Sequence, residues 1–100
     1  MGRYRDLALE NLQKHRPHVL NELRSRGELE SHLDEVESQA EEMFESLHTP
    51  MYQKAMKEQE FLKRLDALRA AHDVADEIVL KELILLPDPE TERAMRQGGY

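Results

Sequence analysis

Apolar residues recur along most of the chain at intervals of three and four, the spacing of amphipathic helices, and the pattern is interrupted at Pro17, Gly27, Pro50 and Pro87. The first stretch, about residues 3–14, should end before Pro17, because the residue preceding a proline is disfavoured in the α conformation. A second, shorter helix begins at Pro17 and ends near Gly27, which can adopt the positive φ of a helix C-terminus. The pattern therefore predicts two short N-terminal helices.

The clearest helical pattern lies between Gly27 and Pro50. Steps of four and three separate successive apolar residues there: Leu29, Leu33, Val36, Ala40, Met43 and Leu47. This alternation is the a/d seam of a coiled coil, and a seam of this limited length suits one helix of a bundle. We expect the helix to end at His48, because Thr49 can cap a following helix and Pro50 can occupy its first turn.

A fourth helical stretch, residues 51–86, contains no glycine or proline. At about 1.5 Å per residue it spans roughly 54 Å, against about 30 Å for the preceding helix. The excess length must be covered by the N-terminal helices or by a second copy of the chain, and the apolar run 78–86 favours cover at that end. The stripe of this stretch is Met51, Ala55, Gln59, Leu62, Leu65, Leu68, His72, Ala75, Val79 and Leu83. We interpret Gln59 as a register-setting residue and His72 as a core or rim residue, with a pH switch as the alternative.

Together these patterns predict an all-α fold, with two short N-terminal helices followed by a long antiparallel helical hairpin. The elements should pack as a small helical bundle that is suited to forming a homodimer. A chain of 100 residues allows one domain, which we place at residues 1–87. Residues 88–100 are expected to form a weakly helical or disordered tail.

Charge is unevenly distributed along the chain, whose formal net charge is −7. Residues 1–27 contain six basic and three acidic residues, whereas residues 28–50 contain eight acidic residues and no basic one. The acidity therefore belongs mainly to the third predicted helix. Its carboxylates could be a solvated face, pair with the basic N-terminal segment, or bind a partner. The candidate partner-binding face consists of Glu37, Glu41, Glu42 and Glu45.

Basic residues in the first two predicted helices form a second candidate site, for contacts with phosphate groups or a partner: Lys14, His15, Arg16, Arg24 and Arg26. No aromatic residues are interleaved with them, so the nucleic-acid signature is weak. Nucleic acid is therefore a less favoured partner than protein.

Enzymatic chemistry has little support in the sequence. The chain has no cysteine, which excludes a thiol nucleophile and a cysteine-based zinc site, and its four glycines do not form a phosphate-binding loop. No serine lies in a nucleophile elbow, the residues three before His32 and His72 are Leu29 and Arg69 where a Glu-x-x-His metal motif has glutamate, and the HExxH motif is missing. We expect a non-enzymatic protein with no catalytic residues, cofactor or metal.

The most apolar run is too short to span a membrane, and a cytoplasmic location is expected.

A series of short motifs extends over about residues 10–85: Lys14-His15-Arg16-Pro17, Leu20, Leu23, Arg26-Gly27-Glu28-Leu29, His32-Leu33-x-Glu35, Gln39-Ala40-x-Glu42 and Ala75-x-Glu77-Ile78-Val79-Leu80-x-Glu82-Leu83-Ile84. In this order the motifs resemble the transposon-encoded TnpV family of bacterial mobile elements. The segment from Met51 to Phe61 departs from the family pattern, which is longer and richer in aromatic residues there.

The resemblance implies a small accessory protein carried on a transposon, integrative element or prophage, and it implies no established activity. We therefore expect an interaction module that binds another protein through its long helices. Two alternatives are kept. One is an acidic DNA mimic that inhibits a host nuclease or defence complex through the third helix. The other is a DNA-binding accessory factor that uses the basic N-terminal helices.

Overall fold

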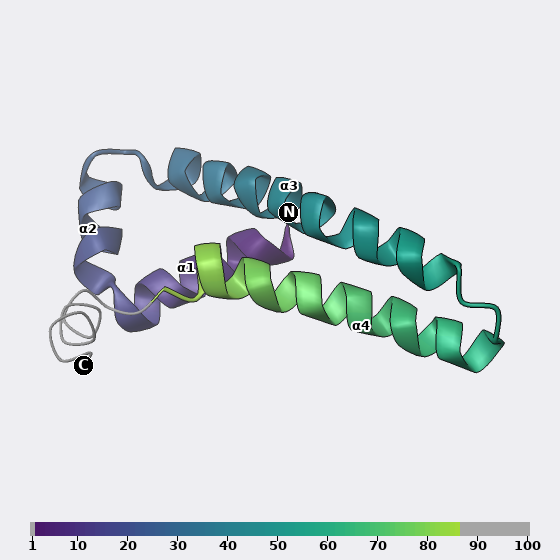
Figure 1. The fold of residues 1–100 in the computed structure, drawn as a ribbon. Helices are drawn as coiled ribbons and strands as arrows, with labels where there is room; N and C mark the ends of the chain where they lie inside the picture. Colours follow the sequence, from purple (N-terminus) through teal and green to yellow (C-terminus); the bar gives the residue numbers. More distant parts are fainter. Residues whose placement is uncertain (1, 87–100) are drawn as a thin grey trace, which may run out of the picture.

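The computed structural model describes residues 2–86. These residues form four α-helices and a π-helical turn, with no strand among them: α1 (Arg3–His15), α2 (Pro17–Ser25), α3 (Leu29–Met56), α4 (Phe61–Val79) and η1 (Leu80–Ile84). Helices α3 and α4 form a long antiparallel hairpin, and α1 and α2 lie at one end of it (Figure 1). The predicted all-α fold is confirmed. The predicted tail, residues 88–100, lies outside the described residues.

The two N-terminal helices begin and end close to the predicted residues. Helix α1 ends at His15, and Pro17 occupies the first turn of α2, where the absence of an N–H leaves no intrahelical hydrogen bond unmade. Gly27 has φ 70°, as expected for a glycine that follows a helix, and its N–H donates to the carbonyl of Arg24.

The predicted boundary between the third and fourth helices is wrong. Helix α3 continues through Pro50 to Met56, and α4 begins only at Phe61. The apolar side of α3 extends without interruption from Leu47 through Met51 to the buried Ala55, so packing against α4 maintains the helix past the proline. A proline inside a helix costs about 3 kcal/mol relative to alanine, and tertiary packing here exceeds that local penalty.

The turn of the hairpin, which we call the tip, is residues 57–60. All four side chains are polar, and Glu60 has the extended backbone (φ −77°, ψ 129°) that commonly precedes a helix. This position gives the hairpin arms of similar length, because α3 has 28 residues, whereas α4 has 19 and the η1 turn that continues it has five. The predicted excess length of the fourth helix therefore does not exist.

The hydrophobic core lies at the opposite end of the hairpin, which we call the base, where α3 begins and η1 ends. Helices α1 and α2 pack there against α3 and η1 and bury these residues: Ala8, Leu12, Leu20, Leu33, Ala40, Val79 and Ile84. The side-chain amide of Asn11 donates to the carbonyl oxygen of Leu86 at 3.1 Å, which ties the end of η1 to α1. The N-terminal helices thus cover part of the apolar run 78–86, including Val79 and Ile84, whereas Ile78 and Leu85 stay exposed.

The π-helical turn explains how the end of the hairpin fits this core. The N–H of Leu85 donates to the carbonyl of Leu80 at 2.6 Å, the five-residue spacing of a π-helix. Because a π-helical turn contains more residues than an α-helical turn, residues five apart in sequence lie closer to the same side of the helix. Val79 and Ile84 are both almost fully buried (0% and 1% exposed).

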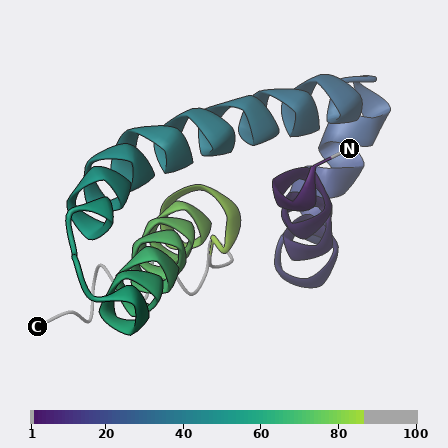
Figure 2. The same ribbon diagram turned by 90° about the vertical axis from the view of Figure 1, so that its right-hand side faces the viewer.

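Helix α1 covers only the base half of the hairpin. Viewed along the hairpin, α3 arches over both α4 and α1, which lie beneath it (Figure 2). Towards the tip, several large apolar side chains are exposed, among them Tyr52, Met56, Phe61, Leu62 and Val74. Three residues of the predicted stripe are therefore misplaced: Gln59 lies in the turn, and Leu62 and His72 are exposed. No helix within residues 2–86 is long and apolar enough to span a membrane.

Replacing Pro50 by alanine should stabilise the protein, because it supplies the missing N–H in the middle of α3. We expect the free energy of unfolding to rise by about 2–3 kcal/mol in urea denaturation. If Pro50 instead began a separate helix, the substitution would leave stability unchanged or lower it, and the continuous α3 would be wrong.

Candidate interaction surfaces

A hydrogen-bonded group around Asp76 holds the start of α1 against α4. The guanidinium of Arg3 donates to both carboxylate oxygens, at 2.5 and 2.8 Å, and the hydroxyl of Tyr4 donates to Oδ1 at 2.9 Å. A bidentate, charge-assisted arrangement of this kind is stronger and more directional than a single neutral hydrogen bond. It fixes the point along the hairpin at which α1 begins.

The Asp76 group shifts the pKa of each of its members. Hydrogen bonding from Arg3 lowers the pKa of Asp76, against the opposing effect of desolvation, and the same bond raises the pKa of Arg3. Burial, followed by the hydrogen bond to Asp76, raises the pKa of Tyr4 to about 12. These shifts favour the ionised Asp76 and the neutral Tyr4 in the folded state.

Arg5 makes the second connection of α1, to α3. Its guanidinium pairs with both Glu30 and Asp34, which lie one turn apart on the same side of α3. The side chain of Arg5 is mostly buried, with 19% of its area exposed, whereas the two carboxylates are largely exposed. Part of the acidic helix is therefore neutralised within the chain, by an arginine that the sequence did not single out.

The four acidic residues of the candidate partner-binding face do not behave as one group. Glu37 is half-buried and is directed to the start of α1, where a Cβ on Gly2 would overlap its carboxylate. Glu41, Glu42 and Glu45 are exposed, and none lies within ion-pair distance of a basic side chain among residues 2–86. Only these three remain for an external partner.

The basic candidate residues also separate. Lys14 pairs with Glu10 of the same helix at 2.6 Å, and Arg26, the residue after α2, pairs with Glu22 of that helix at 2.7 Å. Arg16 is half-buried and, with Asn11 and His32, lines a small cavity of about 120 Å³ between the N-terminal helices, α3 and η1. His15 and Arg24 are exposed.

Four side chains with rings lie between α3 and α4. They are nearer to the tip of the hairpin than the residue at which α1 begins. The ring centroid of His48 lies 5.0 Å from Phe44, 5.7 Å from Tyr52 and 6.4 Å from His72, and the Phe44 and His72 centroids are 5.4 Å apart. We call these four residues the aromatic cluster. Two of its rings are accessible, since 44% of Tyr52 and 60% of the His72 side chain are exposed, whereas Phe44 and His48 are half-buried.

Helix geometry places two free carboxylates beside the aromatic cluster. Glu41 and Glu45 each precede a ring residue of α3 by three and by seven positions, so both run along the outer border of the cluster. We call this pair the acidic edge. The four-residue spacing of Phe44, His48 and Tyr52 was visible in the sequence, but the expected helix end at His48 divided it.

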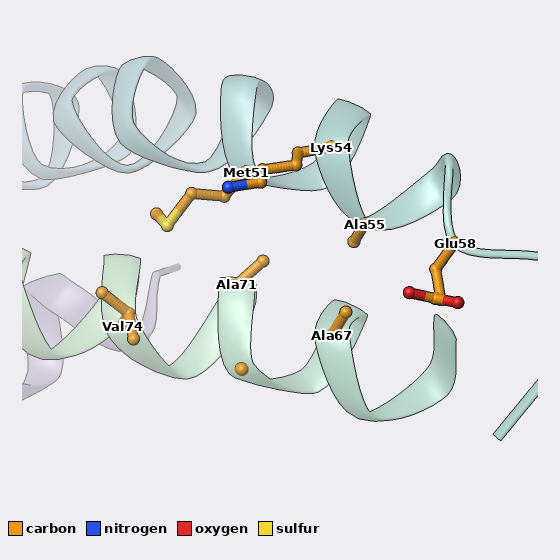
Figure 3. A pocket seen from close by; sticks show the side chains of 8 residues that line it. Met51, Lys54, Ala55, Glu58, Ala67, Ala71 and Val74 are labelled. Atoms are coloured by element: carbon orange, nitrogen blue, oxygen red, sulfur yellow. The ribbon is translucent and has the colours of Figure 1, made fainter. Parts of the chain in front are cut away.

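The side of the hairpin away from the aromatic cluster carries an apolar groove. It has a volume of about 340 Å³ and is walled mainly by small residues of α4 and by Met51 and Ala55 of α3 (Figure 3). Lys54 and Glu58 lie at its border. The α4 wall consists of Ala67, Ala70, Ala71 and Val74. Such small side chains leave space that bulky side chains of another element can fill.

No group of three or more histidine, aspartate or glutamate side chains within residues 2–86 is arranged to hold a metal ion. The surfaces suited to contacts are thus helical and of two kinds, one aromatic and acidic and the other apolar. Residues 2–86 thus form a small helical bundle with accessible side faces.

The TnpV family model, described as transposon-encoded protein TnpV, matches residues 1–84. The chain therefore belongs to the TnpV family, as its motifs suggested. No curated protein and no solved structure matches the chain.

The raised pKa of Tyr4 makes stability sensitive to alkaline pH. The folded state retains the phenol proton up to about pH 12, whereas the unfolded chain loses it near pH 10. The stabilisation is therefore complete below pH 10 and decreases as the pH rises towards 12. We expect Tyr4→Phe to lack this part of the pH dependence in thermal unfolding.

The exposed Tyr52 provides the matched control for this measurement. Tyr52→Phe should leave the alkaline decrease of the melting temperature as it is in the original chain. Equal alkaline profiles for all three proteins would contradict a role for the Tyr4 hydroxyl in holding α1 to Asp76.

Proposed function

We propose that this protein is a non-enzymatic interaction module of a bacterial mobile element, and that it binds a basic segment of another protein. The binding surface is the aromatic cluster together with the acidic edge. Membership of the TnpV family supports the link to a transposon. The binding role is argued from the surface itself.

One observation carries the proposal: accessible rings and free carboxylates lie side by side where α1 leaves the hairpin uncovered. One lysine or arginine side chain can lie over the ring of Tyr52, while another basic side chain of the same segment pairs with Glu45, two helical turns away along α3. Cation–π contacts at exposed sites contribute about 0.5–1 kcal/mol each, and exposed ion pairs about 0.2–1 kcal/mol. Since each contact is weak, the partner segment must present several basic residues at once, as an arginine-rich helix does.

The two alternative functions receive less support from the arrangement of charges. A DNA mimic needs an extended row of free carboxylates, but Arg5 neutralises two acids of α3 and Glu37 is directed to Gly2. A DNA-binding surface needs exposed cations, but Lys14 and Arg26 are paired within their helices and Arg16 lines a cavity. We therefore favour a basic protein segment as the ligand.

A fluorescently labelled, arginine-rich helical peptide tests the proposal in an anisotropy titration. The double substitution Glu41→Gln with Glu45→Gln should weaken binding about tenfold, and Tyr52→Ala about threefold. Glu42→Gln is the matched control, because Glu42 is exposed on the same helix but lines a separate hollow with Met43. It should leave the affinity unchanged.

The outcome that contradicts the proposal is equal weakening by the Glu42 variant and by the acidic-edge variants, since this would show only a general charge effect. Failure of the peptide to bind, with binding of duplex DNA that weakens steeply as salt is raised, would instead support the DNA-binding alternative. Circular dichroism of each variant checks that its helices are retained.

A further inference from the structure

Two of the four rings in the aromatic cluster are histidines, and they come from different arms of the hairpin. His48 belongs to α3 and His72 to α4, and their ring centroids are 6.4 Å apart. Both also lie against Phe44, with centroid distances of 5.0 and 5.4 Å. The surface proposed for a basic partner therefore contains the side-chain type that gains a charge as the pH falls from about 8 to about 5.

Neither histidine is enclosed in the core. The His72 side chain is 60% exposed, and its Nδ1 lies 3.4 Å from Oδ1 of Asp73. His48 is half-buried and stacks on Phe44 with an angle of 19° between the ring planes. Because both imidazoles lie at the surface of the hairpin, they can take up a proton while the helices stay folded.

The two histidines are bordered by charged or titratable side chains of three helices: Glu41 and Glu45 of α3, Arg69, Asp73 and Asp76 of α4, and Arg3 and Tyr4 of α1. Asp76 is already held by Arg3 and Tyr4. Hydrogen bonding from Arg3 is the main cause of the lowered pKa of Asp76, and the charge of His72 contributes to it. A proton on His72 is therefore felt by the carboxylates around it.

The other carboxylates of this set are available to a partner. Glu41, Glu45 and Asp73 form no ion pair with a lysine or arginine within residues 2–86. The nearby basic residue Arg69 is exposed and precedes His72 by three positions on α4. Three negative charges outweigh this single positive charge, so the surface attracts basic groups as long as the imidazoles are neutral.

We propose that the aromatic cluster is a pH-dependent binding site, at which protonation of His48 and His72 releases the basic segment of the partner. This inference rests on the proposed function, because it concerns the same surface. Neutral imidazoles offer ring faces to a guanidinium group and leave the acidic edge open to the charges of the ligand.

Protonation changes the site in two ways, and both are unfavourable to a basic ligand. An imidazolium repels a guanidinium group that lies over the rings. It also competes with the ligand for the neighbouring carboxylates, because it is a positive charge that the chain itself supplies. The two histidines lie in one cluster, so a ligand that covers the cluster meets both charges.

Anisotropy titrations of the arginine-rich peptide, blocked at both ends, test the inference at pH 7.8 and at pH 5.8 in the same low-salt buffer. Imidazole groups change charge over this interval, whereas arginine does not titrate and carboxyl groups ordinarily titrate below it. An exposed charge changes an affinity by about threefold. With two histidines, we expect the dissociation constant of the original chain to be about tenfold higher at pH 5.8.

The double substitution His48→Asn with His72→Asn should remove this pH dependence, because asparagine cannot be protonated. The readout is the ratio of the dissociation constants at the two pH values, which should be close to one for this variant. The matched control is His15→Asn with His18→Asn, since both of these histidines are exposed and lie outside the cluster. It should keep the ratio of about ten.

The outcomes separate this inference from the proposed function. A ratio near one for the original chain, or an equal decrease of the ratio in both double variants, would overturn the pH-dependent site alone. Loss of helix at pH 5.8 in circular dichroism would also overturn it, since release would then follow from unfolding. Failure of the peptide to bind at pH 7.8 would overturn the proposed function and this inference with it.

Discussion

The pairing of Arg3 and Tyr4 with Asp76 is the interaction on which the remaining surfaces depend. It joins residues more than 70 positions apart and fixes the point at which α1 starts along the hairpin. From that point to the base, α1 and α2 pack against the hairpin, whereas Tyr52 and His72, which lie further towards the tip, are exposed. The aromatic cluster is accessible because α1 begins where it does.

Charge within the molecule has two functions that the net value of −7 does not separate. Some acidic residues of α3 and α4 bind arginines of α1 and hold the N-terminal helix in place: Glu30, Asp34 and Asp76. Others, including Glu41 and Glu45, have no basic neighbour in the described part of the chain and remain for external contacts. Internal pairing therefore determines which carboxylates a partner can reach.

The TnpV chain is, on this view, a bundle with two different side faces. One combines rings and carboxylates, which suits a basic segment of another protein. The other is the apolar groove walled by small residues of α4 and by Met51 and Ala55 of α3.

Local patterns in the sequence determined the helices, the positions of Pro17 and Gly27 at the ends of α1 and α2, and the concentration of acid in α3. These features depend on neighbouring residues, so they can be inferred without a structure. The course of α3 through Pro50 could not, because the local penalty of a proline is offset by packing of Ala55 against a helix that follows in the chain. For the same reason the exposure of His72 and Leu62 was missed: periodicity identifies a side of a helix but not what lies against it. Only the tertiary structure decided which carboxylates are neutralised and which face is open, because both depend on the position of α1, set by contacts between residues far apart in sequence.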